Sequence, residues 1–420
     1  MLSRSAIAGA LSFALLAAAC RSGALRAGGY ESIRLDDIAP KYLTLTQSWN
    51  ALGLDDRGRV YSVWTSRRDD GREDAALFRF TPATKQREFL GTFIDVAAAQ
   101  GNLRQAEELP KGHTRIVQVG RKLYMASQGF HDFKADIDAL PKYRGAHLFS
   151  YDLDRGVLED VTRNLPDGVL LEHQGIIALA YSPEHRLLIG LSHPHSDLVL
   201  FDPAAGAIRK LVRGIPWQRE RMVSREFIVT RTGKIYTMRG AEEAKLRSVE
   251  NEVWVYDIAK DEQHATGQHL TGGFWNGLAE APDRNTFYVS TVSGELYAFD
   301  VASERFSRLG DFIAAEDAQY RVKYLYGIAL LPAADAIVGV PILERNGGGR
   351  ARHTLSRVTE YSIARREFRA IASVERAVHT GSAHVDRRGN VYMAAFDWDT
   401  NCRLAILTPS LTAASSNRSH

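Results

Sequence analysis

Histidines, arginines and aromatic residues recur at corresponding places along this 420-residue chain, each near the start of a short apolar run. Imidazoles can bind divalent metals, guanidinium groups can form paired hydrogen bonds with carboxylates, and aromatic faces can stack on sugar rings. The residues with this character are Asn50, His113, His173, Arg225, Asn276, Tyr326 and His379, with His193 and His195 in an adjoining loop. They predict a site for a small polar or anionic ligand if the fold brings them together.

A divalent metal site is the most specific chemistry that these residues could support, since neutral imidazoles from separate segments can converge on one ion. The histidines that could take part are His113, His173, His193, His195 and His379. No HExxH motif or comparable close spacing supports a metal, so hydrogen bonding is the alternative role for each of them.

No catalytic motif names a reaction. The chain has no P-loop, no dinucleotide fingerprint and no GxSxG elbow, and Cys402 lies at the start of an expected strand. Catalytic residues therefore stay unassigned, and whether the protein is an enzyme stays open. If it is one, a lyase or hydrolase acting on a sugar or sugar acid fits the candidate residues.

The elements that must position these side chains form an internal repeat, in which an apolar strand ends in an aromatic residue and often in Asp. It occurs at 77–80 (LFRF), 148–152 (LFSYD), 198–202 (LVLFD), 253–257 (VWVYD), 296–300 (LYAFD), 358–362 (VTEYS) and 404–408 (LAILT). Within each unit a small-residue strand such as GIIALAY comes first, and a tight turn and a second strand follow it. The strand that ends in an aromatic residue comes after these. Seven units of four strands, spaced by about 55 residues, predict an all-β, seven-bladed β-propeller of antiparallel blades.

These units resemble those of bacterial seven-bladed β-propellers of the broad YVTN, NHL and SMP-30-like group, over nearly all of the chain after its leader. The plan is also similar to that of oligogalacturonate lyases, which combine seven blades with a histidine-rich metal site. That second likeness concerns the fold alone, and it assigns no catalytic residue to this sequence.

Blade seven lacks a fourth strand of its own at the C-terminus, while residues 30–35 (YESIRL) form a strand that precedes blade one. We expect this N-terminal strand to complete blade seven and close the ring, which removes an open sheet edge. The recurring Asp152, Asp202, Asp257 and Asp300 are expected to accept hydrogen bonds in turns rather than to bind a ligand.

The lengths of the connections distinguish the two faces of the expected ring. Turns that join the first strand to the second and the third to the fourth are short, as in RTGK and ASER. The other connections are long, among them SRRDDGREDA in blade one and an Ala- and Gln-rich run at 95–110 that could hold a short helix. Binding residues concentrate on long loops of a rigid scaffold, so the site is expected on that face.

The N-terminus predicts export. Residues 6–19 form an apolar run after Arg4, too short for a comfortable membrane span, and Ala17-Ala18-Ala19-Cys20 resembles a bacterial lipobox. We favour lipidation of Cys20 over simple cleavage after Ala19, although Leu16 lies one place too far from the cysteine for the usual pattern. The expected organisation is a signal peptide at 1–19, a tether at 20–29, the propeller at 30–410 and a disordered tail at 411–420.

The formal net charge of +3 is small for this length and argues against a nucleic-acid binder. Two functions remain. One is an exported, lipid-anchored monomer of the bacterial envelope that binds, and could act on, a small polar or carbohydrate-like ligand. The other is an envelope scaffold that docks a partner protein without catalysis. Inward-pointing His, Arg and Asn residues favour the first.

Overall fold

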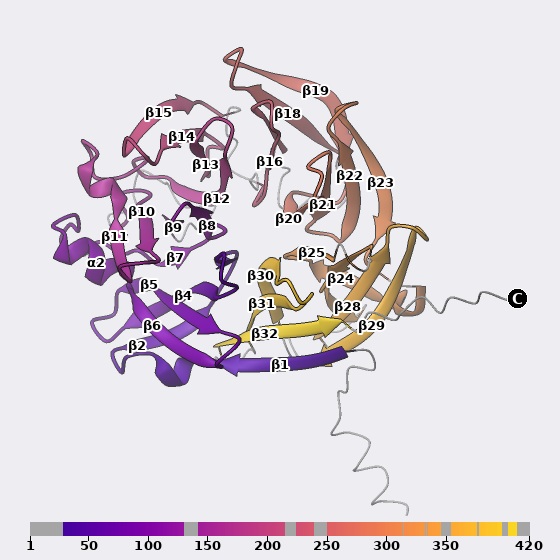
Figure 1. Cartoon of the computed structure of the whole chain (residues 1–420), viewed down its shortest axis with the longest axis horizontal. Helices are drawn as coiled ribbons and strands as arrows, with labels where there is room; N and C mark the ends of the chain where they lie inside the picture. Colours follow the sequence, from indigo (N-terminus) through magenta and orange to yellow (C-terminus); the bar gives the residue numbers. More distant parts are fainter. Residues whose placement is uncertain are drawn as a thin grey trace, which may run out of the picture.

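A computed structural model describes residues 28–129, 142–214, 224–238, 250–313, 315–331, 333, 335–345, 354–375, 378–396 and 402–409. Within these residues the chain forms seven antiparallel sheets arranged as blades around a common axis, as Figure 1 shows. Each blade runs outward from the axis through four successive strand positions. The expected seven-bladed β-propeller is therefore confirmed.

The strands nearest the axis coincide with the predicted small-residue strands. They are β3 (Leu52–Leu54), β8 (Val117–Val119), β12 (Gly175–Ser182), β16 (Ile228–Val229), β20 (Trp275–Glu280), β25 (Ile328–Leu331) and β30 (Val378–Val385). Small residues are needed there because neighbouring blades touch backbone to backbone. A Cβ on Gly53 would lie 2.4 Å from the Ile116 carbonyl oxygen, and one on Gly327 would lie 2.6 Å from the Gly381 carbonyl oxygen.

The second position of each blade holds the strand that follows a tight turn. These strands are β4 (Val60–Arg68), β9 (Lys122–Gln128), β13 (Leu187–His193), β17 (Lys234–Met238), β21 (Thr286–Thr291), β26 (Ala336–Gly339) and β31 (Val391–Phe396). The third position holds the repeat motif. These strands are β5 (Glu73–Thr81), β10 (Leu148–Asp152), β14 (Leu198–Asp202), β18 (Asn251–Asp257), β22 (Glu295–Asp300), β28 (Thr354–Ser362) and β32 (Cys402–Pro409).

The outer strand of blade seven comes from the N-terminal side of the chain, as expected. β1 (Gly28–Arg34) pairs antiparallel with β32 from Gly28↔Pro409 to Arg34↔Arg403, and the two lie side by side in Figure 1. The other outer strands are β6 (Gln86–Thr92), β11 (Val157–Asp160), β15 (Ala207–Val212), β19 (Glu262–Leu270), β23 (Arg305–Asp311) and β29 (Glu367–Glu375). Joining the two ends of the chain in one blade leaves the ring without a gap.

A few elements lie outside this scheme. Strands β2 (Leu43–Gln47), β7 (Lys111–Gly112), β24 (Tyr320–Tyr324) and β27 (Ile342–Arg345) extend blades one, two and six, and η1 (Asp36–Ile38), η3 (Val161–Asn164) and η5 (Ala315–Asp317) are single 3-10 turns. The expected helix is α2 (Phe93–Ala99), which Thr92 caps by accepting from the Asp95 N–H. No helix in the described ranges is long and apolar enough to span a bilayer.

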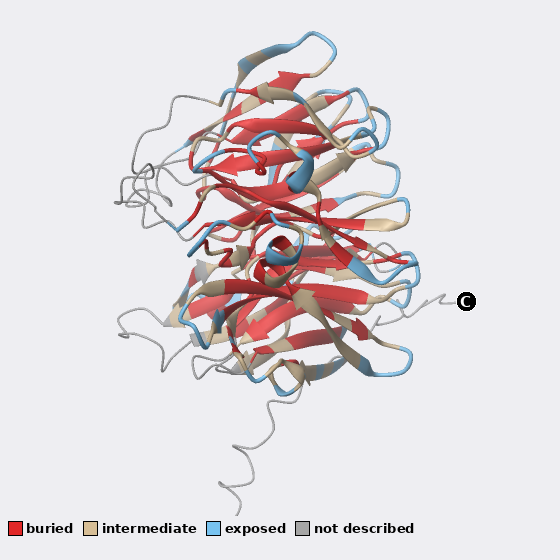
Figure 2. Ribbon diagram, turned by 90° about the vertical axis from the view of Figure 1, so that its left-hand side faces the viewer, coloured by how far each residue is buried: buried red, intermediate tan, exposed pale blue. Residues whose placement is uncertain are grey.

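Hydrophobic side chains of neighbouring blades pack against each other. Much of the length of the strands is buried, as Figure 2 shows. One cluster joins blades one and two through residues such as Tyr61 and Phe149, and another joins blades seven and one through Trp64 and Leu404. The short turns on the opposite side from the long connections are largely exposed. There Asp202 accepts from the N–H groups of Ala204 and Ala205 at 2.9 and 3.0 Å, which confirms the turn role expected for the recurring aspartates.

One expected long connection is wrong. In blade one, β4 and β5 continue as a paired hairpin as far as Arg67↔Glu73, so SRRDDGREDA is mostly strand. The turn is confined to residues 69–72, where Gly71 has a positive φ of 84° and its N–H donates to the Arg68 carbonyl. The charged residues that suggested a loop instead pair with one another along the hairpin, as Arg68 does with Asp74 at 2.8 Å.

Candidate functional site

Five side chains gather at the end of the ring axis where the inner strands begin. Trp49, Lys111, His113, Arg225 and Tyr326, called here the axial cluster, come from blades one, two, four and six and each lies ahead of or at the start of an inner strand. By the topology of the blades this end also receives the longer connections. Parts of those connections, including His131 and Asp132, lie outside the described residues.

Arg225 is at the centre of the axial cluster. Its guanidinium carbon lies 5.9 Å from the Trp49 ring centroid, 5.1 Å from that of Phe274 and 5.6 Å from that of Tyr326. Its Nε and Nη1 atoms are buried and donate no hydrogen bond among the described residues, and no carboxylate of these residues forms an ion pair with it. A buried guanidinium that contacts aromatic faces, and whose Nε and Nη1 have no acceptor within the described ranges, is suited to receive one from a ligand.

Lys111 and His113 flank the same indole ring. Lys111 Nζ lies 5.1 Å from the Trp49 centroid, and the His113 ring stacks on Trp49 with centroids 6.3 Å apart and planes 8° from parallel. Burial, then the charge of Arg225, lowers the pKa of Lys111 to about 7, while Glu73 opposes the shift. Burial and the nearby charges of Arg225, Lys111 and His193 hold the pKa of His113 well below its ordinary value.

The lowered pKa values of Lys111 and His113 share an electrostatic cause. Besides burial, the charge of Arg225 lowers both pKa values, and the charge of Lys111 lowers that of His113 further, because adjacent positive charges repel. An anion bound in this cluster would relieve that repulsion, so the electrostatic field favours a negatively charged ligand.

A buried ion pair lies directly below the axial cluster. Arg115 of blade two donates from Nε to Glu226 Oε1 of blade four at 2.7 Å and from Nη2 to the Leu278 carbonyl of blade five at 2.6 Å. Asn50 Nδ2 also donates to Glu226 Oε1, at 3.2 Å. Burial raises the pKa of Glu226 against the opposing charge of Arg115. These bonds link blades across the axis and fix the segments that carry Trp49 and Arg225.

Three predicted site residues form hydrogen bonds within the protein, although the buried Nδ1 of His379 has no partner in the described part of the chain. Asn50 donates to the Arg225 carbonyl as well as to Glu226, and Asn276 Nδ2 donates to the Leu325 carbonyl at 2.6 Å. His379 Nε2 lies 3.2 Å from the Tyr30 hydroxyl of the closing strand. Asn50 and Asn276 therefore position neighbours of the cluster, and His379 links the inner strand of blade seven to its outer strand.

Two predicted histidines lie outside the five residues of the axial cluster. His173 is exposed, with a positive φ of 56°, and its backbone N–H donates to the Arg144 carbonyl. His195 is half-buried in the loop after β13. The described residues contain no group of three His, Cys, Asp or Glu side chains arranged to hold a metal, so the metal hypothesis gains no support from them.

The sequence reasoning missed Lys111, Arg115 and Glu226. A signal for two of them was present, because Lys111, His113 and Arg115 alternate, and alternating residues of an extended segment lie on one face. Glu226 directly follows Arg225, and nothing in the sequence shows that Arg115 of another blade would pair with it.

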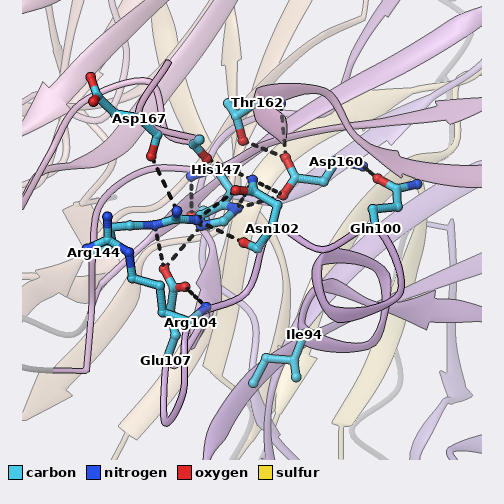
Figure 3. A network of polar contacts seen from close by, with 12 residues as sticks. Ile94, Gln100, Asn102, Arg104, Glu107, Arg144, His147, Asp160, Thr162 and Asp167 are labelled. Carbon is cyan, nitrogen blue, oxygen red and sulfur yellow. Dashed lines mark hydrogen bonds and ion pairs between the residues drawn. The ribbon is translucent and has the colours of Figure 1, made fainter. Parts of the chain in front are cut away.

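A second polar group lies within blade two, at the base of the connection between β6 and β9 (Figure 3). His147 Nδ1 lies 2.7 Å from Asp160 Oδ2, and its Nε2 lies 3.2 Å from Glu107 Oε1. Arg144 contacts Glu107 at 3.3 Å and donates to Asn102 Oδ1 at 3.0 Å. These five residues are called the blade-two network.

Every charge in the blade-two network has a partner. Burial alone would lower the pKa of His147, but its bonds to Asp160 and Glu107 outweigh burial and raise it. Asn102 Nδ2 donates both to Asp160 and to the Gly168 carbonyl at 2.8 Å. The network fastens the connection after α2 to the rest of the blade, which is a structural role.

No known family profile and no curated protein matches this chain. Among solved structures, a chain of the "Crystal Structure of Mitotic Checkpoint Complex" is similar, with a TM-score of 0.53 and 9% identity over 89% of this chain and 93% of that chain. At this identity the likeness supports the propeller fold alone.

Proposed function

We propose that the protein binds a small anionic molecule with a ring or other flat apolar face, such as a sugar acid, at the axial cluster. The observation that carries this proposal is Arg225, whose buried Nε and Nη1 lack acceptors while three aromatic rings surround its guanidinium. A carboxylate would accept from these donors, and the Trp49 indole offers a stacking face for a sugar ring.

The repulsion between the basic groups supports the same proposal. The low pKa values of Lys111 and His113 express unfavourable charge that a bound anion would offset. Because Arg115 and Glu226 bond across the axis beneath the cluster, the ligand approaches from the face with the long connections.

Thermal unfolding of the mature protein with gluconate, glucuronate and galacturonate, each compared with its neutral sugar, tests the proposal. The acids should raise the melting temperature and the neutral sugars should not. Arg225→Gln should abolish the effect, whereas Arg57→Gln, in an exposed turn of the opposite face, should leave it intact. Equal shifts with neutral sugars, or an unchanged shift in Arg225→Gln, would refute binding at this cluster.

Failure of every acid, together with specific recovery of one envelope protein on an affinity column, would instead favour the scaffold function. We also propose export and lipid anchoring through Cys20, on the pattern of the leader. Labelling with a radioactive fatty acid in a bacterial host should mark the wild type and not Cys20→Ala.

A further inference from the structure

We propose that Lys111 forms an imine with the carbonyl carbon of a small oxo acid whose carboxylate is bound by Arg225. The inference rests on the proposed function, because it uses the same axial cluster, and it narrows the ligand to acids that carry an aldehyde or ketone. Open-chain sugar acids belong to this class.

The positions of the two cations suit such a ligand. Lys111 Nζ and the Arg225 guanidinium carbon lie 5.1 and 5.9 Å from the centroid of the same indole, that of Trp49. Besides burial, the charge of Arg225 lowers the pKa of Lys111, so the two cations are close to each other. An oxo acid carries its carbonyl and carboxylate within a few bonds of each other, and we infer that one molecule bound between the two cations meets both. Two anchoring points on one small molecule also fix its orientation.

The backbone beneath Lys111 is held rigidly. Lys111 pairs with Gln128 of β9, and Gly112 follows in a place where a Cβ would lie 2.6 Å from Val63 Cγ1. The lysine side chain thus starts from a fixed point, which limits the volume that its amine can reach. A positioned nucleophile reacts faster than a freely moving one.

Imine formation needs a neutral amine, and the surroundings of Lys111 supply one. Burial and the neighbouring guanidinium lower the pKa of its amine to about 7, so a large fraction is neutral at neutral pH. An ordinary lysine, with a pKa of about 10.4, is almost fully protonated there. Desolvation next to a second cation is an established way to activate a lysine nucleophile.

The reaction balances without an oxidant or reductant. The amine lone pair forms the C–N bond while the carbonyl π electrons move to oxygen, and a proton passes from the nitrogen to that oxygen to give a neutral carbinolamine. The hydroxyl gains a second proton and leaves as water while the nitrogen lone pair forms the C=N bond, which gives a protonated imine. Solvent can supply and take up these protons. His113 stacks on the same indole as Lys111, and its Nδ1 lies 3.3 Å from the Ile177 carbonyl. A carbonyl only accepts, so this bond puts the proton on Nδ1 and the lone pair on Nε2.

Reductive trapping tests the inference. The mature protein is treated with glyoxylate and cyanoborohydride, which converts an imine into a stable carboxymethyl amine, and the lysines are compared by peptide mapping. Label at Lys111 should exceed label at the exposed Lys260, in an opposite-face turn, by at least about tenfold. Lys111→Arg should lose this label, and Lys260→Arg should keep it.

Label spread over surface lysines with no excess at Lys111 would overturn the inference, and this result comes from the wild type even if Lys111→Arg does not fold. Arg225→Gln should weaken trapping of glyoxylate more than that of propanal, because both aldehydes meet an amine whose pKa is no longer lowered by Arg225, and only glyoxylate also loses a partner for its carboxylate. An equal loss for both aldehydes in Arg225→Gln would remove Arg225 as the anchor.

Gluconate, an acid without a carbonyl, separates this inference from the proposed function. If gluconate raises the melting temperature but Lys111 is not labelled, the imine fails and anion binding stands. If gluconate and glyoxylate both fail to bind, the proposed function fails as well.

Discussion

The axial cluster and the blade-two network are both buried groups of polar side chains, yet they satisfy their charges in opposite ways. In the network, His147 lies between the carboxylates of Asp160 and Glu107. In the axial cluster, Arg225 faces aromatic rings and no carboxylate of the described chain forms an ion pair with it.

This difference in charge balance indicates which of the two groups of polar residues is the better candidate for ligand binding. A network whose members satisfy one another stabilises the fold and has little left to offer a ligand. A buried group that keeps free donors costs stability, and such costs concentrate at functional sites. Polarity and burial alone would rank the two regions equally, whereas the balance of donors and acceptors separates them.

The largest expected effect is the loss of stability when the blade-two network is broken. Asp160→Ala removes an acceptor from His147, Asn102 and Thr162 at once, so the free energy of unfolding should fall by about 3–5 kcal/mol. Urea denaturation measures this, and affinity for a sugar acid should not change. Asp154→Ala, an exposed turn residue, is the control and should behave like the wild type. A loss below about 1 kcal/mol would show that the network is not a structural clamp.

The matching change in the axial cluster should have the opposite profile. Arg225→Met keeps the apolar stem and removes a buried cation without a carboxylate, so stability should stay the same or rise by about 1 kcal/mol. Affinity for the best-binding sugar acid should fall about tenfold to a hundredfold, since charge-assisted hydrogen bonds are lost. Denaturation and titration calorimetry measure the two quantities. A large loss of stability with unchanged affinity would make Arg225 a structural residue.

The pH dependence of stability should distinguish His147 of the blade-two network from His379, which lies at the start of the inner strand of blade seven. Burial lowers the pKa of His379, close to the axial end of β30, from 6.5 to about 4. Below pH 6.5 the unfolded chain binds a proton at this histidine, whereas the folded chain does not until the pH is near 4. The free energy of unfolding therefore falls by about 2 kcal/mol between pH 7 and pH 5. Urea denaturation of His379→Gln should show a shallower loss over that interval, and an unchanged slope would contradict the assignment.

His147 should respond in the other direction. Its folded pKa is raised, so its stabilisation is complete below the unfolded pKa of about 6.5 and is lost as the pH rises through the folded value. Relative to the wild type, His147→Gln should therefore lose more stability at pH 6 than at pH 9. A constant difference across this range would mean that His147 is neutral between its carboxylates.

The smallest expected effect concerns ring closure. Tyr30→Phe removes the hydroxyl that meets His379 and should lower stability by about 1 kcal/mol. Hydrogen exchange should quicken in β1 and β32 before other blades. Tyr181→Phe, whose hydroxyl makes no hydrogen bond among the described residues, should leave both measurements unchanged. Uniform acceleration over all blades would show that closure is not local.

The sequence by itself determined the architecture, because short strands, Gly-containing turns and turn aspartates act over a few neighbouring residues. The seven repeats, the closing strand and the short turns of one face could all be predicted in this way. The blade-one hairpin was misjudged because charged residues suggested a loop, and only pairing such as that of Arg67 with Glu73 showed a strand.

Only the tertiary structure decided the site. Residue types predicted His113, Arg225 and Tyr326 near one end of the axis, but which side chains share a ring, a charge or a carbonyl depends on contacts between blades. Asn50 and Asn276 have a structural role because their side-chain amides donate to the carbonyls of Arg225 and Leu325. Lys111 emerged as a candidate because burial beside Arg225 changes its amine. Desolvation and Coulomb repulsion are properties of three-dimensional neighbours, so no pattern along the chain could state them.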